Sequence, residues 1–212
     1  MIRLGMRVAS EPKVYLAGPE VFLPNAREIG RQKKELCKKY GFRGLYPYDN
    51  EVDSSNPTGS TAQTIYESNI ALLKSAQCII ANLTPFRSPS ADVGTVFELG
   101  FMVGCGKPVF GYTNDRRDYL TRVQRMFGRA PLDDRRNAWV DRNGMSVENF
   151  GNSDNLMVDM SLLRYGLPIV RCQCKRERRF SDLTGFEVCL GAAANYFRDQ
   201  ITRRSAAHAE LS

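Results

Sequence analysis

The sequence predicts an α/β protein of three layers, with helices on both faces of a central, mostly parallel five-stranded sheet. Short apolar runs of strand length alternate along the chain with longer segments of helical periodicity. This alternation is typical of parallel sheets that are covered on both faces. Because crossovers between parallel strands are right-handed, few arrangements remain, and we expect a flavodoxin-like or Rossmann-like one.

The size and composition are those of a single globular domain. The chain has 212 residues, of which 42% are apolar and 25% charged, and this is enough for a sizeable core. We expect an N-terminal extension over 1–12, one domain over 13–203 with a polar insertion at about 113–155, and a tail over 204–212. No apolar run approaches the ~20 residues that span a bilayer, and no signal-peptide pattern is present. These features predict a cytoplasmic protein without a membrane partner.

The charge, the cysteines and the histidine content argue against several functions. The formal net charge is +7, but the basic residues are scattered and no nucleic-acid motif accompanies them. A solvated surface that attracts anionic small molecules explains them better than a nucleic-acid groove. The six cysteines form no CxxC pair and fit reduced thiols that act as small hydrophobes. The single histidine, His208, lies in a polar tail, so we expect neither a metal nor a cofactor.

The first strand is predicted at Lys13–Ala17, because this apolar run is broken by the turn signal Gly18-Pro19. A helix follows over Asn25–Tyr40, where apolar side chains share one face and Lys and Arg fill the other. Gly41 suits the position just after that helix. Gly44–Pro47 then predicts a short second strand.

The segment Tyr48–Gly59 is polar and rich in turn formers, which predicts a surface loop able to cover a site. Thr61–Ser75 has the apolar content of a helix. Cys78–Ala81 predicts a buried strand and Lys107–Tyr112 a further strand, with an apolar helix between them. Together they predict a βαβ unit.

The chain from Thr113 to Asn155 is polar and irregular. Because that is long for a connection in a compact domain, we expect an insertion, a binding segment or a partly mobile segment there. Leu156–Leu163 predicts a short helix, Leu167–Val170 a last strand, and Leu183–Arg203 a closing amphipathic helix.

Two carboxylates draw attention within the βαβ unit. Asp92 precedes its helix, where either Asp92 or Ser90 suits the N-cap. Glu98 follows about a turn later among apolar side chains. The loop before this helix leaves the carboxyl end of a strand, which is where ligands of such sheets bind.

Glu98 has two interpretations from its surroundings alone. It is either a structural glutamate or a nucleophile, and Asp92 is explained equally well as a helix cap. The positive end of the helix dipole favours an ionised Glu98, and apolar neighbours exclude competing water. A carboxylate that attacks an anomeric carbon while another group protonates the leaving group carries out glycosyl transfer with retention. The pair therefore permits this chemistry.

Three segments resemble the nucleoside 2-deoxyribosyltransferase family. They are YLAGPEVF at Tyr15–Phe22, ANLTPFRSPSADVGTVFELG at Ala81–Gly100 and SDNLMVD at Ser153–Asp159. The resemblance runs from about Lys13 to Asp159, and its middle block is the most specific because both carboxylates and their spacing agree. It implies a flavodoxin-like enzyme of nucleoside salvage that transfers 2-deoxyribose between nucleobases through a deoxyribosyl-enzyme intermediate, without cofactor or metal.

The resemblance also implies a role for each matched residue. Glu98 would capture C1′ of the sugar, and Tyr15 would hydrogen-bond to that carboxylate and orient it. Asp92 would bind the base edge and help to protonate the base as it leaves. Asn155 would reach into a neighbouring protomer's site and hold the 5′-hydroxyl, so we expect a homo-oligomer.

Four more residues are candidates for substrate binding. Gly18 and Phe22 belong to the matched segment after the first strand. Asn69 stands where some family members carry an aspartate, and an amide cannot act as a base. We therefore hypothesise that Asn69 binds substrate while Asp92 transfers the proton. Arg87 either lines the base pocket or supports its loop.

Two other functions compete with this interpretation. If water replaced the acceptor base, the protein would be a nucleoside or nucleoside 5′-monophosphate N-glycosidase. GTVFE at 94–98 also resembles the GTxxE part of the cytokinin-activating phosphoribohydrolase signature, although the preceding Pro-Gly-Gly is missing. The second competitor is a non-catalytic nucleotide-binding module on the same fold, which would not require a nucleophile. The sequence has no GxGxxG and no P-loop motif.

Overall fold

A computed structural model of the chain describes residues 11–49, 59–165 and 167–209, with the side chains of 204–209 outside that description. The strands are β1 (Lys13–Ala17), β2 (Arg43–Leu45), β3 (Cys78–Asn82), β4 (Val109–Thr113), β5 (Leu132–Asp133), β6 (Ala138–Val140), β7 (Ser146–Val147) and β8 (Val170–Arg171). The α-helices are α1 (Ala26–Lys39), α2 (Gly59–Ser75), α3 (Val93–Gly104), α4 (Tyr119–Phe127), α5 (Leu156–Leu163) and α6 (Thr184–Ala209). Short 3₁₀ turns cover Pro19–Phe22, Pro47–Asp49 and Arg176–Arg178.

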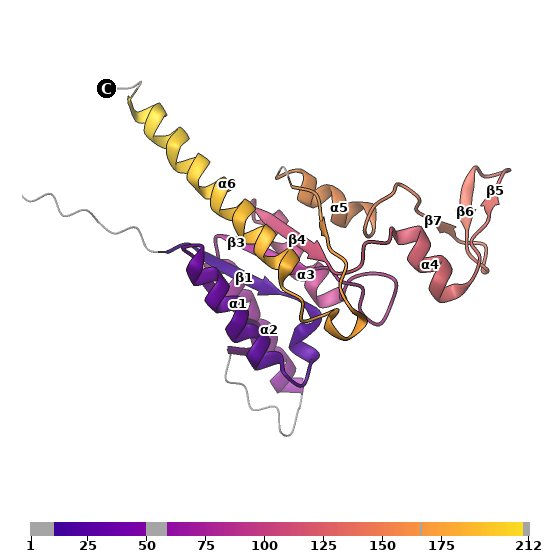
Figure 1. Cartoon of the computed structure of the whole chain (residues 1–212), viewed down its shortest axis with the longest axis horizontal. Helices are drawn as coiled ribbons and strands as arrows, with labels where there is room; N and C mark the ends of the chain where they lie inside the picture. Colours follow the sequence, from indigo (N-terminus) through magenta and orange to yellow (C-terminus); the bar gives the residue numbers. More distant parts are fainter. Residues whose placement is uncertain (1–10, 50–58, 166, 210–212) are drawn as a thin grey trace, which may run out of the picture.

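Five strands form one parallel sheet in the order β2-β1-β3-β4-β8. Figure 1 shows β1, β3 and β4 crossing the centre of the molecule, with α6 running along them. This strand order is that of flavodoxin-like folds, so the predicted fold class is confirmed. In the sheet, β2 lies on one side of β1 and β3 lies on the other side, so the direction in which strands are added reverses after β2. The boundary between β1 and β3 is therefore the switch point at which ligands of such sheets bind.

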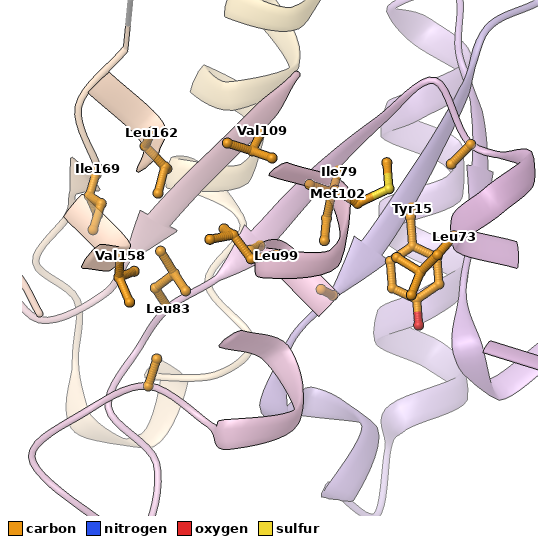
Figure 2. Packing of buried hydrophobic residues seen from close by; sticks show 14 of the residues in the cluster. Tyr15, Leu73, Ile79, Leu83, Leu99, Met102, Val109, Val158, Leu162 and Ile169 are labelled. Atoms are coloured by element: carbon orange, nitrogen blue, oxygen red, sulfur yellow. The ribbon is translucent and has the colours of Figure 1, made fainter. Parts of the chain in front are cut away.

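Alternate side chains of the strands contribute to two separate cores. Tyr15 and Ile79 belong to the core on the side of α2, α3 and α5, which Figure 2 shows from close by. Leu16 and Ile80, the next residues along the same strands, belong to the core on the side of α1 and α6. Because both faces are covered, the strands are apolar throughout and not alternating.

The prediction of an irregular segment from Thr113 to Asn155 is wrong in part. It contains α4 and a small antiparallel sheet of β5, β6 and β7, and these elements lie together at one end of the molecule (Figure 1). Asp118 caps α4 by accepting a hydrogen bond from the Thr121 N–H over 2.7 Å. Strands of two or three residues are too short to show an alternating pattern, which explains why the sequence did not reveal them.

The strand β1 and the helix α5 have their predicted bounds, and the other elements differ from theirs by a few residues. The second strand ends at Leu45, and Pro47 instead opens a 3₁₀ turn, since proline has no N–H for a sheet. The closing helix continues to Ala209. Most of the loop predicted over 48–59, most of the extension over 1–12 and the last three residues of the tail lie outside the described residues. Among the described helices, none combines the length and the apolar character needed to span a membrane.

Candidate active site

A cavity of about 600 Å³ lies where β1, β2 and β3 end, at the switch point of the sheet. We call it the Glu98 cavity. Its described lining residues come from the loop after β1 (Gly18, Val21, Phe22), the start of α1 (Arg27), the turn after β2 (Pro47, Tyr48, Asp49), α2 (Ile65, Asn69) and the beginning of α3 (Asp92, Gly94, Thr95, Glu98).

A hydrogen bond between two side chains from different elements lies at the wall of the cavity, where Glu98 lines it. The Tyr15 hydroxyl donates to Oε1 of Glu98 over 2.5 Å. Tyr15 is fully buried in β1 on the side that faces α3, and Glu98 is the sixth residue of α3. The bond orients the carboxylate and leaves its Oε2 for reaction with a ligand.

Burial dominates the ionisation of this pair. Burial and the negative charge of Asp92 raise the pKa of Glu98, and the hydrogen bond from Tyr15 lowers it. The net pKa is about 7. The net shift is thus opposite to the ionised state that the helix dipole was expected to favour. The dipole acts mainly within the first turn of a helix, and Glu98 lies beyond it. Burial and the Glu98 charge also raise the pKa of Tyr15, so this hydroxyl keeps its proton.

Asp92 is the N-cap of α3 and also lines the cavity. Its Oδ2 accepts hydrogen bonds from the backbone N–H of Thr95 over 2.9 Å and from the Thr95 hydroxyl over 3.0 Å. Both of these bonds use one oxygen, so Oδ1 remains for a ligand. Structural capping and a chemical role are therefore compatible at Asp92.

Three further candidates from the sequence lie in the same cavity. Gly18 and Phe22 line it from the loop after β1, and Asn69 lines it from α2. Packing also requires a glycine at position 18, because a Cβ there would overlap the carboxylate of Glu20. The structure thus brings six of the eight predicted residues to one place, counting Tyr15 through its bond to Glu98.

Arg87 and Asn155 are the two candidates that do not line the Glu98 cavity. The Arg87 guanidinium lies 5.1 Å from the ring centre of Phe22 and 4.5 Å from that of Phe86. Its backbone has φ 57°, which is uncommon for a residue with a side chain. These contacts favour the second interpretation of Arg87, that it supports the loop.

Asn155 is exposed and caps α5 within its own chain. Its Oδ1 accepts from the Met157 N–H over 3.0 Å, and its Nδ2 donates to Oε1 of Glu148 over 2.7 Å. The side chain is therefore held in place at the surface. A role in a neighbouring protomer's site remains a prediction.

Tyr48 and Asp49, which line the cavity from the turn after β2, begin the loop that was predicted to cover a site, but they were not singled out as site residues. Lys34 donates a hydrogen bond from Nζ to Oδ1 of Asp49 over 2.7 Å, and Arg27 lies 5.1 Å from the ring centre of Tyr48. A signal was available, because every loop that follows a strand of a parallel sheet opens at the ligand-binding edge.

A buried ion pair under the loop after β1 was also missed. Lys33 and Glu20 are both fully buried and form a direct ion pair, and Asn82 at the end of β3 donates a hydrogen bond to the second oxygen of Glu20 over 2.9 Å. Burial lowers the pKa of Lys33, and the Glu20 carboxylate compensates for the lost hydration. A lysine four residues from both Ile29 and Cys37, within the apolar stripe of α1, was the available signal.

The described residues contain no cluster of three or more His, Cys, Asp or Glu side chains suited to a metal ion. The functional groups around the Glu98 cavity include the Tyr15 phenol, the Asn69 amide, the Arg27 guanidinium and the carboxylates of Asp49, Asp92 and Glu98.

The fold and the cavity define a flavodoxin-like α/β protein with a carboxylate-based candidate active site at its switch point. The family model of nucleoside 2-deoxyribosyltransferases matches residues 14–157. The chain belongs to this family, and the resemblance stated from the sequence is confirmed.

Two relatives illustrate how far the similarity extends. An uncharacterised protein of Schizosaccharomyces pombe is 39% identical over 133 residues, which cover 61% of this chain and 59% of that protein. The chain thus spans about three-fifths of the length of this curated relative. The solved structure of the 2-desoxiribosyltransferase from Leishmania mexicana is 32% identical, with a TM-score of 0.55, and the match covers 81% of this chain and 96% of that one. The family model and this solved structure agree on the family and on its fold.

Proposed function

We propose that the protein transfers 2-deoxyribose from one nucleobase to another, with Glu98 as the nucleophile and a role in nucleoside salvage. The observation that carries the proposal is the buried hydrogen bond from Tyr15 to Glu98 in a cavity that also holds Asp92. A purely structural glutamate would not need a cavity of about 600 Å³ beside it, which is the size of a small-molecule site.

In the first step, Oε2 of Glu98 attacks C1′ and forms an ester as the bond from C1′ to the base nitrogen breaks. The electron pair of that bond goes to the base, which leaves with a proton supplied through Asp92. Tyr15 holds Oε1 throughout, so the attacking oxygen is already oriented.

In the second step, a nitrogen of the acceptor base attacks C1′ from the side that the first base left. The ester bond breaks, the Glu98 carboxylate is restored, and the acceptor nitrogen gives up its proton to Asp92. Each attack inverts the anomeric carbon, so the product retains the donor's configuration. No cofactor or metal enters either step.

The charge of the lining favours nucleosides over nucleoside 5′-monophosphates. Three carboxylates, Asp49, Asp92 and Glu98, face one guanidinium, Arg27, among the described lining residues. Asp49 is already paired with Lys34, so Asp92 and Glu98 oppose Arg27, and the described lining has no surplus of positive charge to hold a phosphate dianion. We propose 2′-deoxynucleosides and free nucleobases as the substrates.

Asn69 and Asn155 are proposed as binding residues. Asn69 would hydrogen-bond to the substrate without transferring a proton. If Asn69→Ala and the wild type accept the same donors at the same rate, Asn69 has no binding role. Asn155 is proposed to complete the site of a second copy of this chain, in a homo-oligomer, because its side chain is exposed and oriented by Glu148.

The decisive experiment incubates the protein with deoxyinosine and adenine and measures deoxyadenosine by chromatography. We expect exchange in the wild type and a loss of at least about 10³-fold in Glu98→Gln, because an amide cannot form the ester. Glu35→Gln is the matched control, since Glu35 is an exposed carboxylate on α1 paired with Arg31. Exchange by Glu98→Gln at the wild-type rate would overturn the mechanism.

Trapping provides a second, direct measurement. A slow fluorinated 2′-deoxynucleoside donor should leave a glycosyl adduct on the peptide that contains Glu98, detectable by mass spectrometry. Free deoxyribose without a second nucleoside, even with excess adenine, would instead indicate the hydrolase. Donor binding without any turnover would indicate the non-catalytic module.

A further inference from the structure

A second cavity, of about 410 Å³, shares no lining residue with the Glu98 cavity. We call it the arginine cavity, because five of its described lining residues are Arg87, Arg117, Arg122, Arg125 and Arg179. They come from the loop after β3, the loop after β4, α4 and the segment before α6. Side chains distant in sequence thus place their positive charges around one space.

The carboxylates near this space are too few to balance these charges. Asp115 accepts a hydrogen bond at Oδ1 from Nε of Arg117 over 2.8 Å, and its Oδ2 lies 3.7 Å from Nη2 of Arg179. Asp154 lies 3.8 Å from Nη2 of Arg122. Two carboxylates therefore face five guanidiniums in the described part of the chain, and an anion would lower the electrostatic energy of the site.

Arg122 is the residue that most needs a ligand. Its side chain is 3% exposed, yet Nε, Nη1 and Nη2 make no hydrogen bond with any described residue. The 3.8 Å to Asp154 exceeds hydrogen-bond distance, and the same Asp154 oxygen already accepts from the backbone N–H of Ala91 over 2.8 Å. Burial lowers the pKa of Arg122, and the neighbouring Arg117 acts in the same direction. Buried donors without acceptors are costly and rare in folded proteins.

We propose that the arginine cavity binds a phosphate group, either as inorganic phosphate or as the phosphomonoester end of a small metabolite. A tetrahedral dianion offers acceptor oxygens on several sides, so it can bond to guanidiniums that arrive from separate elements. A planar carboxylate would reach fewer of them. Phe86, Met126 and Phe180 complete the wall and strengthen these interactions by excluding water.

The cavity is built on a rigid support. Nδ2 of Asn114, directly after β4, donates to the backbone oxygens of Arg179 over 2.9 Å and of Asp182 over 3.0 Å. This holds the segment before α6 against the sheet, while α4 supplies Arg122 and Arg125 in helical geometry. Guanidiniums held in this way lose little freedom when an anion binds.

An aromatic wall separates the two cavities. Phe22 lines the Glu98 cavity and Phe86 the arginine cavity, and their rings are stacked with centres 5.3 Å apart. The phosphate site is therefore distinct from the place where a sugar would meet Glu98.

The test is isothermal titration of the full chain with inorganic phosphate, in phosphate-free buffer held at constant ionic strength with chloride. We expect saturable binding with one phosphate per chain, and at least a tenfold loss of affinity in Arg122→Met and in Arg125→Gln. Arg125 is exposed, so its variant keeps the fold even if Arg122→Met does not. Arg129→Gln is the matched control, an exposed arginine near the end of α4 that does not line the cavity, and it should bind like the wild type.

A parallel titration with glycerol 3-phosphate, a phosphomonoester without a nucleobase for the Glu98 cavity, separates the two sources of phosphate. Tighter binding than inorganic phosphate supports a phosphomonoester, and weaker binding supports the free ion. Binding that is non-saturable, or unchanged in both Arg122→Met and Arg125→Gln, overturns the proposal. A wild type that binds no phosphate also overturns the proposal. If Arg125→Gln then changes the oligomeric mass measured by light scattering, the cavity is a protein contact. Nucleobase exchange is not a readout here, so a failure of the proposed function leaves these outcomes intact.

Discussion

The hydrogen bond between Tyr15 and Glu98 leads to a quantitative prediction about pH. Tyr15→Phe removes the hydroxyl that donates to Oε1 of Glu98 over 2.5 Å and leaves the ring in the buried cluster that also contains Leu73 (Figure 2). That bond stabilises the ionised carboxylate and lowers the pKa of Glu98 against the effect of burial. Without it, the pKa of Glu98 should rise above its value of about 7.

The size of the shift follows from the strength of such a bond. Hydrogen bonds to charged groups contribute about 1.5–3 kcal/mol, and one pKa unit corresponds to about 1.4 kcal/mol. The pKa of Glu98 should therefore rise by about 1–2 units. Since the ionised form attacks C1′, activity at pH 7 should fall roughly 5- to 50-fold, and most of the loss should be recovered at about pH 9.

The assay is the initial rate of exchange from deoxyinosine to adenine between pH 5 and 10. We expect the acid limb of the profile to move to higher pH in Tyr15→Phe. Tyr40→Phe is the matched control, since the Tyr40 hydroxyl also donates to a glutamate, Glu187, over 3.2 Å, but on the exposed surface. Infrared titration of the carboxyl band, with Glu98→Gln as the reference, measures the same shift without turnover.

A profile that keeps its midpoint would refute this reasoning. An equal loss of rate at every pH would mean that Tyr15 orients the carboxylate without influencing its ionisation. An acid limb that moves to lower pH would mean that the bond stabilises the protonated form.

Three further predictions follow from the same geometry. Burial raises the pKa of Glu98 from its ordinary 4.5 to about 7, so between these pH values the native state holds a proton that the unfolded chain releases. The contribution of this group to stability therefore falls as pH rises through that window. In urea unfolding, Glu98→Gln should be more stable than the wild type by up to about 2–3 kcal/mol at pH 8, with no such advantage at pH 4. Asp92→Asn keeps a good N-cap and should retain the melting temperature, but exchange should drop about 10²- to 10⁴-fold, and an unchanged rate would exclude proton transfer through Asp92. A Cβ at Gly30 would overlap the buried Tyr46 ring, so Gly30→Ala should cost about 1–3 kcal/mol by denaturant unfolding, whereas Gly100→Ala, which meets nothing within 4 Å, should be neutral or stabilising.

The elements of the sheet and its main helices were predictable because burial on both faces leaves a local pattern. β1 and α5 have the predicted bounds, and α1 lies within one residue of its prediction at each end. The small sheet of β5, β6 and β7 was not predictable, since its strands are held by pairing with one another and not by a pattern of their own. The end of the closing helix was also missed, because its last turns carry no large apolar side chain that would continue the pattern.

The candidate site was partly predictable for a related reason. Glu98 and Asp92 belong to one continuous segment, so their spacing on a helix can be read from the sequence. The rule that loops meet at the carboxyl ends of parallel strands then brings Gly18 and Phe22 to the same edge. Tyr48 and Asp49 follow the same rule, but nothing in their local sequence distinguishes them from ordinary turn residues.

The sequence by itself determined the α/β class, the family and several of the residues that line the Glu98 cavity, because these depend on short-range periodicity and on contiguous motifs. Only the tertiary structure decided how ionised Glu98 is, since its pKa depends on burial between elements that are distant along the chain. It alone also revealed that arginines from four separate segments surround one cavity, with Arg122 buried and without a hydrogen-bond partner among the described residues. The physical reason is that desolvation and charge imbalance depend on all the side chains that surround a group, and those side chains come together only when the chain folds.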